Sequence, residues 1–504
     1  MTQSKSLSAD PRLSQLVPPA CLEGRTLWVG GQWHGAADGA TFETTSPIDG
    51  SFLLNVARGK AADIDAAVRS AASAAPGWGG DGGARAATMR QIAREIRQHA
   101  QALGTVETLD SGRAIADTAG GSVAHSAGLF DYYAGLADKL HGSTVPMGNG
   151  ATVLVEREPF GVIGAIAPWN YPLLNAATKI APIIACGNAL VLKPAEQTPL
   201  VTLLLARLMQ QAGLPDGVVN IVTGFGAEAG APLVTHPEVG KISFTGSTAT
   251  GRHIAAEAGR SLKGVVLELG GKSPLVVFED ADLRRAARAA VFSTFMNAGQ
   301  TCTSCARVLV ARNVLEQFEA HCRAEAALLR VGDPLDPATQ IGPIVSAEQL
   351  ERVRRLTAGV AGEEVAKEGY RPVSGGHFFP PTIVSRFDFD GDFARDEIFG
   401  PVMAIRSFDS DEEAWALAND TTYGLAGSVW TSSLHRAEQT RRRLQCGIVW
   451  INCVHSLSAG TPVSGHKASG LGIEYGLEAA DQYMKVKTTV MMSGAWNSPF
   501  AAQI

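Results

Sequence analysis

The middle third of the chain alternates short apolar runs with helical patterns, and this alternation constrains the fold more than any other feature. The runs are rich in β-branched residues and end at Gly or Pro: FGVIGAIAP, NALVLKP, GVVNIVTG and KISFTGS. The segments between them carry apolar residues at helical spacing, as in NYPLLNAATKIAPIIAC and TPLVTLLLARLMQQAG. Strands that alternate with helices predict βαβ units and a parallel sheet buried on both faces.

The alternation extends in both directions along the chain. GVVLELGG, SPLVVFED and the helix DLRRAARAAVFSTFM follow, and a second alternating region runs from ARVLVA to about residue 450. Earlier, LWVGGQW, TFETTSP and SFLLNVA predict strands, and AADIDAAVRSAASAA and ARAATMRQIAREIRQHAQALGTVETLD predict two helices. Residues 1–25 are predicted to be a mobile tail or a surface arm. Because 504 residues exceed one small core, we expect a large α/β protein with two nucleotide-fold-like lobes.

Charge and cysteine usage exclude several classes of partner. The net charge is −6, and the cluster Arg441–Arg443 fits a solvated helix face, so nucleic acid is not an expected partner. The N-terminal segment lacks the apolar core of a secretory signal, and no apolar run approaches the ~18 residues that span a bilayer. Seven scattered cysteines suit a reducing compartment. We therefore expect a cytoplasmic protein that binds no membrane.

Two glycine-bearing turns follow predicted strands. GVVNIVTGFGAEAG places Gly226 and Gly230 before a helix, with a spacing one residue longer than the usual dinucleotide fingerprint. KISFTGSTATG places Gly246 and Ser247 at another strand-to-helix turn, where backbone N–H groups can bind pyrophosphate. Neither turn has the Lys-Ser/Thr ending of a P-loop. Both are also compatible with ordinary βα turns.

The segment NAGQTCTSC admits two interpretations. Cys302 and Cys305 form a C-x-x-C pair, as in a redox dithiol or half of a metal site. No second C-x-x-C or nearby His pair completes a zinc site. The alternative is a single nucleophile, Cys302, with Cys305 as a small buried residue.

Two further polar residues stand out. Glu268 in LELGGKS lies at the end of an apolar strand, as a general base with a raised pKa or as a salt-bridged structural residue. Asn170 in APWNYP lies at a turn, from which its amide could donate to an oxyanion.

The order of these motifs resembles the aldehyde dehydrogenase superfamily, in its hydrolytic NAD(P)-dependent branch. The chain carries PWNYP at 168–172, KPAEQTP at 193–199, FTGST at 244–248, LELGGKSP at 267–274, GQTC at 299–302 and EIFGPV at 397–402. The resemblance covers about residues 25–490.

The resemblance implies a catalytic role for three residues. Cys302 is similar to the thiolate nucleophile, which forms a thiohemiacetal and, after hydride passes to C4 of the nicotinamide, a thioester. The side chain of Asn170 and the N–H of Cys302 would form the oxyanion hole. Glu268 is similar to the general base that activates the hydrolytic water, which argues against the CoA-acylating relatives. A non-enzymatic protein on the same scaffold would not need these three residues.

The resemblance also implies NAD as cofactor, with NADP possible. Lys193 and Glu196 match the positions that hold the adenosine ribose, where a carboxylate accepts from a 2′-hydroxyl and repels a 2′-phosphate. The predicted cofactor-binding residues are Ile166, Trp169, Lys193, Glu196, Gly226, Gly230, Phe244, Gly246, Ser247, Leu269, Glu397 and Phe399. No metal ion is predicted.

Three parts are expected from the family fold. A Rossmann-like NAD-binding domain would span residues 1–134 and 154–266, and an α/β catalytic domain residues 267–479. A small β oligomerisation domain would comprise a ribbon at 135–153 and a C-terminal strand at 480–504, giving a homodimer or homotetramer. ATVLVEREP and MKVKTTVMM are suitable strands for it.

The chain departs from the family pattern at its last motif, SGHKASGLGIEYG. Ser464 replaces a Gly and Ile473 replaces an Arg, so this segment is expected to pack differently from that of the family.

The substrate is predicted to be a small aldehyde. GIVWINC is similar to enzymes that cage a cationic betaine aldehyde or aminoaldehyde with aromatic rings, and Tyr132 and Tyr133 could form one wall. The helix after PWNYP lacks the expected Trp, however, and Val463 stands where another would be. A neutral aromatic or aliphatic aldehyde is therefore favoured, with His455 and Asn175 as candidate pocket residues.

Overall fold

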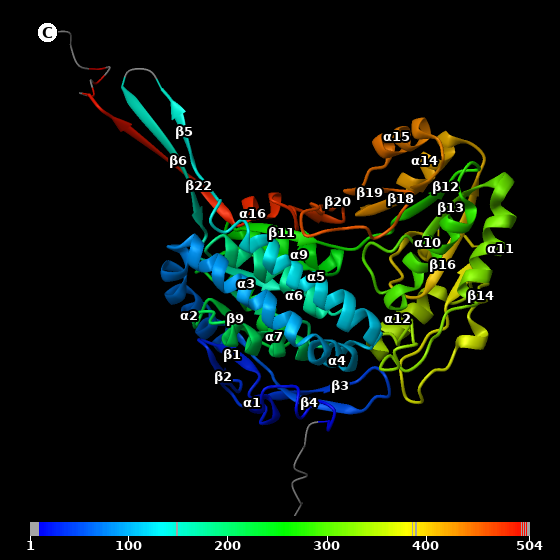
Figure 1. Cartoon of the computed structure of the whole chain (residues 1–504), viewed down its shortest axis with the longest axis horizontal. Coiled ribbons are helices and arrows are strands. Elements are labelled where there is room, and N and C mark those ends of the chain that lie inside the picture. Colours follow the sequence, from blue (N-terminus) through cyan, green and yellow to red (C-terminus); the bar gives the residue numbers. More distant parts are fainter. Residues whose placement is uncertain are drawn as a thin grey trace, which may run out of the picture.

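Two lobes and a projecting ribbon make up the chain (Figure 1). The computed structural model describes residues 10–147, 150–385, 387–388, 391–494, 496, 498 and 500. Each lobe is built around one large sheet whose central strands are parallel. The predicted α/β class with parallel sheets is thus confirmed.

The first lobe has an eight-stranded sheet in the order β2-β1-β9-β8-β7-β10-β11-β21. Its strands are β1 (Leu27–Val29), β2 (Gln32–His34), β7 (Val162–Ile166), β8 (Ala189–Lys193), β9 (Val219–Ile221), β10 (Val239–Thr245), β11 (Gly264–Glu268) and β21 (Gly470–Leu471). The chain winds outward from β7 through β8 to β9, then returns to add β10 and β11 on the other side. The strand order therefore reverses between β7 and β10, and open α/β sheets bind ligands at such a point.

Helices cover both faces of this sheet because its strands alternate between two apolar faces. Ile163 and Leu190 belong to one core, with α3 (Gly82–Gln98), α4 (Ala100–Ser111), α5 (Val123–Ala134), α6 (Pro172–Ala185) and α7 (Leu200–Gln211). Val162 and Val191 belong to the opposite core, with α2 (Ala61–Gly79), α8 (Ala231–Thr235) and α9 (Thr248–Arg260). These near-continuous apolar strands are those predicted from the sequence.

The second lobe repeats this plan with a seven-stranded sheet in the order β14-β15-β16-β13-β12-β18-β19. Its strands are β12 (Pro274–Val277), β13 (Arg307–Ala311), β14 (Glu363–Glu364), β15 (Thr382–Val384), β16 (Val402–Phe408), β18 (Ala426–Trp430) and β19 (Ile448–Ile451). Helices α10 (Leu283–Phe295), α11 (Leu315–Ala326), α12 (Ala347–Thr357), α14 (Asp411–Asn419) and α15 (Leu434–Arg443) surround it.

The ribbon consists of β5 (Ser143–Pro146), β6 (Ala151–Pro159) and β22 (Met484–Met492) in the order β22-β6-β5. It extends away from the first lobe (Figure 1). β6 pairs with β22 along its whole length, so the predicted domain boundary between residues 153 and 154 falls inside a strand. Residues 148–149, 495, 497, 499 and 501–504 of the predicted oligomerisation segments lie outside the described residues, as do residues 1–9 of the predicted first domain.

Two sequence predictions near the N-terminus need correction. Leu13, Val17 and Cys21 are buried in the core of the first lobe while residues between them are exposed, so the described part of residues 1–25 is a packed surface arm and not a mobile tail. The long helical pattern before residue 111 is two helices, because His99 leaves the helical conformation with φ −103° and ψ 24°. No helix of the described residues is long and apolar enough to span a bilayer.

Candidate active site

The carboxyl ends of β7, β8, β10 and β11 meet at one edge of the first sheet. Ile166 is in register with Lys193 on one side and with Phe244 on the other, and Thr245 is in register with Glu268. The N–H of Gly246 donates to the backbone carbonyl of Glu268 at 3.0 Å. Five of the predicted positions, namely Ile166, Lys193, Phe244, Gly246 and Glu268, therefore converge at the point where the strand order reverses.

Cys302 lies on a tight turn that follows α10. Asn297, Ala298 and Gly299 all have left-handed backbones, with φ of 50°, 53° and 74°. A Cβ atom on Gly299 would overlap the carbonyl oxygen of Gly400, and one on Gly271 would overlap the carbonyl oxygen of Cys302. The close approach of these glycines brings Cys302 against the strand end that carries Glu268.

We expect Gly299→Ala to reduce activity at least tenfold and to lower the melting temperature. A left-handed Ala costs about 1–2 kcal/mol, and the overlap with Gly400 adds to this. Calorimetry and NADH absorbance would measure both effects. Gly259→Ala, in helix α9 where nothing lies near the new Cβ, is the matched control and should leave both unchanged or raise stability slightly. Equal behaviour of the two variants would contradict the role given to the turn.

The side-chain amide of Asn170 is held in one orientation. Its Nδ2 donates to the carbonyl of Gln300 at 3.0 Å, and its Oδ1 accepts from Nδ2 of Asn175 at 3.3 Å. Asn297 Nδ2 donates to the backbone carbonyls of Asn170, at 2.9 Å, and of Gln300, at 3.2 Å. Because an amide nitrogen carries two hydrogens, Asn170 keeps one donor beyond the bond to Gln300.

Glu268 is a buried carboxyl group, and one of its two oxygens lacks a hydrogen-bond partner among the described residues. Its side chain is 6% exposed, and the oxygen without such a partner is Oε1. Burial raises its pKa well above the usual range, the charge of Glu474 raises it further, and Lys179 opposes both effects. A carboxylate with a raised pKa is a stronger base than an ordinary Glu, as a general base requires.

The thiol of Cys302 is protonated at rest. Burial raises its pKa to about 12, and the charges of Glu397 and Glu268 act in the same direction, whereas the N–H groups of Thr303 and of Cys302 itself lower it. A thiolate at this position therefore requires a nearby proton acceptor.

Cys305 differs from Cys302 in its environment. It is fully buried in the core of the second lobe, and all seven cysteines are free. No group of three His, Cys, Asp or Glu side chains with metal-site geometry occurs within the described part of the chain. The C-x-x-C pair is therefore neither a disulfide nor part of such a group.

The predicted ribose-binding residues surround the same edge. Lys193 Nζ is buried and bonds Oε2 of Glu196 at 3.0 Å. The rings of Trp169 and Phe399 meet edge to face with centroids 5.3 Å apart, and Phe399 has a left-handed φ of 56°. Glu397 Oε1 accepts from the N–H of Gly271 at 2.9 Å, and burial raises the pKa of Glu397 to about 7.

At the other predicted cofactor positions, only some of the residue's atoms are available for contact with a ligand. The side chains of Phe244 and Leu269 belong to the core beneath the edge, so a contact with cofactor would use their backbone. The hydroxyl of Ser247 accepts from the N–H of Thr250 at 3.2 Å and caps α9. Gly226 has open space at its Cβ position, and Gly230 packs against Lys193 and Ile166.

The two tyrosines predicted as a cage wall are not equivalent. Tyr133 is 1% exposed and donates its hydroxyl to the carbonyl of Gly476 at 3.0 Å, so the prediction is wrong for this residue. Its ring is part of the core because α5 turns it inward. Val463 is likewise buried, and Ser464 bonds the carbonyl of Gly472 at 3.0 Å.

A buried lysine is the main feature that the sequence interpretation missed. Lys179 Nζ donates to Glu474 Oε1 at 2.9 Å, to Thr245 Oγ1 at 2.8 Å and to Ser243 Oγ at 3.2 Å. A lysine in the middle of the apolar helix α6 was the available signal, because a charge there needs buried partners.

Comparison with known proteins agrees with this geometry. The sequence model of the aldehyde dehydrogenase family matches residues 33–489. Indole-3-acetaldehyde dehydrogenase of P. syringae, solved with NAD+, is 38% identical, with a TM-score of 0.89 and coverage of 93% of this chain and 96% of that one. The aldehyde dehydrogenase KauB of Pseudomonas aeruginosa is 38% identical, with a TM-score of 0.88 and coverage of 92% and 96%. Betaine aldehyde dehydrogenase of Staphylococcus aureus, also solved with NAD+, is 32% identical, with a TM-score of 0.90 and coverage of 94% and 96%.

The resemblance stated from the motifs is thereby confirmed. The chain belongs to the aldehyde dehydrogenase family, a family of NAD(P)-dependent oxidoreductases that act on small-molecule aldehydes.

Proposed function

We propose that this protein oxidises a neutral aldehyde to a carboxylic acid with NAD, through an acyl group carried by Cys302. One observation carries the proposal. The Cys302 turn lies beside the buried Glu268, whose Oε1 has no hydrogen-bond partner among the described residues, and beside the Asn170 amide, whose orientation is fixed. Measurement of NADH formation with a panel of aldehydes tests it, and no turnover with any aldehyde would contradict it.

The chain's own residues account for bond formation and hydrolysis. The thiol of Cys302 first loses its proton to solvent. Its Sγ then attacks the carbonyl carbon, and the free hydrogen of the Asn170 amide and the N–H of Cys302 stabilise the oxyanion. A bound nicotinamide would accept the hydride that leaves this carbon. The aldehyde carbon is thereby oxidised to the level of a thioester. Glu268 then takes a proton from water as its oxygen attacks the acyl carbon and the C–S bond breaks.

The residues at the sheet edge fit a dinucleotide. The 13-residue helix α9 begins at the strand reversal and presents N–H groups and a positive dipole for a pyrophosphate. Lys193 and Glu196 would hold the adenosine ribose, and Glu397 would hold the nicotinamide ribose beside the Trp169–Phe399 pair. A carboxylate at Glu196 favours NAD because it repels a 2′-phosphate.

Glu196→Gln is therefore expected to raise the ratio of kcat/KM for NADP to that for NAD by about tenfold or more. The change removes the repulsion and frees the buried ammonium of Lys193 for the phosphate. Steady-state kinetics with both cofactors would measure the ratio. Glu238→Gln, on the exposed surface, should leave it unchanged, and a similar shift in both variants would contradict the assignment.

A neutral aromatic or aliphatic aldehyde is the proposed substrate class. Burial of Tyr133 removes one of the two tyrosines expected to form a wall of an aromatic cage for a cation. Betaine aldehyde or an aminoaldehyde is the alternative, since the enzyme of S. aureus named above acts on betaine aldehyde. A screen of kcat/KM over aromatic, aliphatic and cationic aldehydes distinguishes these substrate classes. Repeating the screen with and without CoA shows whether the enzyme has CoA-acylating activity.

We further propose that the ribbon mediates assembly into a homodimer or homotetramer in the cytoplasm. Its apolar side chains are unusually exposed: Val145, Met147, Val486, Val490 and Met491 are 46–61% exposed. We retain the three-part division proposed from the sequence, with the ribbon extended through β6. Light scattering of the full chain would give the number of subunits.

A further inference from the structure

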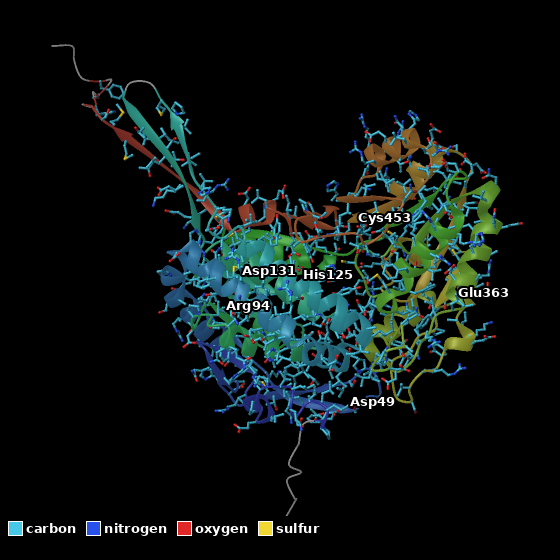
Figure 2. The ribbon with its side chains drawn as sticks, viewed as in Figure 1. Asp49, Arg94, His125, Asp131, Glu363 and Cys453 are labelled. Carbon is cyan, nitrogen blue, oxygen red and sulfur yellow. The ribbon has the colours of Figure 1, made fainter. Side chains whose placement is uncertain are left out.

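His455 makes a set of contacts with the nucleophile turn that the proposed function does not use. Figure 2 places Cys453, two residues before it, at the junction of the lobes. His455 follows β19 with a left-handed φ of 52°. Its ring lies 5.3 Å from the ring of Trp450 and 6.0 Å from that of Phe292, so packing fixes its plane.

Both ring nitrogens of His455 meet hydroxyl groups next to the nucleophile. Nε2 lies 2.8 Å from Oγ of Ser293, and Nδ1 lies 3.3 Å from Oγ1 of Thr303. A neutral imidazole has one donor and one acceptor, so it can satisfy both hydroxyls at once. Burial keeps it neutral by lowering its pKa to about 4.

The hydroxyl of Ser293 extends this network to the other end of the turn. It accepts from the N–H of Cys305 at 2.9 Å, and the carbonyl of Ser293 accepts from Oγ of Ser304 at 2.9 Å. His455 and Ser293 therefore hold the turn by hydrogen bonds to Thr303, Ser304 and Cys305, the three residues that follow the nucleophile.

The 303–305 turn affects the pKa of the Cys302 thiol. The N–H groups of Thr303 and Cys302 lower the pKa of the Cys302 thiol, against burial and the charges of Glu397 and Glu268. Tyr171 and Tyr475 also interact with the charge of Cys302. Movement of Thr303 would remove one of the few contacts that favour the thiolate.

We infer that His455 is a positioning residue, whose neutral imidazole holds the 303–305 turn so that the backbone of Thr303 keeps its place beside Cys302. The inference rests on Cys302 being the nucleophile of the proposed function. It does not require that His455 touch the aldehyde.

The rate of alkylation of Cys302 by iodoacetamide against pH tests this inference without turnover. Mass spectrometry of the Cys302 peptide in the full-length protein gives the rate, and the partly exposed Cys446 serves as internal reference. We expect His455→Ala to slow alkylation at neutral pH by roughly tenfold and to move the profile about one pH unit higher. The kcat should fall while the KM for NAD stays unchanged.

Three further variants keep the test decisive. His455→Asn should recover part of the rate, because its amide offers a donor and an acceptor. Thr303→Val should shift the profile as His455→Ala does, since it retains the N–H and loses the hydroxyl. His435→Asn, exposed on α15, should leave the profile unchanged.

An unchanged profile in both His455→Ala and Thr303→Val would overturn the inference. The same shift in His435→Asn would do so too. If His455→Ala fails to fold, the profiles of His455→Asn and Thr303→Val decide. The two proposals can fail separately. If the profile shifts in the variants but the native protein oxidises no aldehyde, the positioning role stands and the proposed function is refuted. If the native protein oxidises aldehydes but the profile does not shift in the variants, the proposed function stands and the positioning role is refuted.

Discussion

Cys302→Ala should abolish aldehyde oxidation, with kcat/KM reduced by at least about a thousandfold, while NAD still binds. The change removes the sulfur proposed to form the thiohemiacetal, and the loss of a covalent nucleophile has effects of this size or larger. Lys193, Glu196 and Glu397 are unchanged by it, so the affinity for NAD should be retained. NADH absorbance measures the first effect and titration calorimetry the second.

Cys305→Ala is the matched control for this experiment. Cys305 is fully buried, so its truncation should cost some stability but leave oxidation largely intact. If Cys302→Ala kept full activity and Cys305→Ala lost it, the nucleophile would be Cys305. Loss of NAD binding in Cys302→Ala would mean that the thiol supports the cofactor site itself.

The elements predicted best are those whose pattern is local. ATVLVEREP and MKVKTTVMM match the bounds of β6 and β22. These two strands pair over nine residues although they lie more than three hundred positions apart in the chain. Only the family resemblance predicted this pairing from the sequence. Conversely, the break at His99 was missed because the apolar spacing continues through it on both sides.

The candidate site was predictable in its residue types but not in its contacts. Glu268 stood out because an acid in an apolar strand is costly, and the structure shows it buried. Asn175 and His455 were noticed as possible pocket residues, yet their partners, Asn170 and Thr303, lie on other segments and depend on tertiary packing. Tyr133 was misplaced because neighbouring tyrosines on one helix point in different directions.

Glu268→Gln should convert the enzyme into one that is acylated rapidly and hydrolysed slowly. We expect a burst of about one NADH per site, followed by a steady rate reduced by roughly a hundredfold or more, because a positioned base contributes about 10²–10⁴-fold. Stopped-flow absorbance would resolve the burst, and intact-mass spectrometry would detect the acyl group on Cys302. Hydroxylamine, a stronger nucleophile than water, should accelerate release in the variant.

The pH dependence of hydrolysis gives a second signature of the same residue. Burial and the charge of Glu474 raise the pKa of Glu268, so its base form increases as the pH rises through a range above that of an ordinary Glu. The hydrolysis rate of the native enzyme should therefore rise with pH across that range, and Glu268→Gln should lack this limb. Glu238→Gln should keep both the limb and the native steady rate. Unchanged turnover without a burst in Glu268→Gln would refute its role as the base, since the C–S bond would then be broken without it.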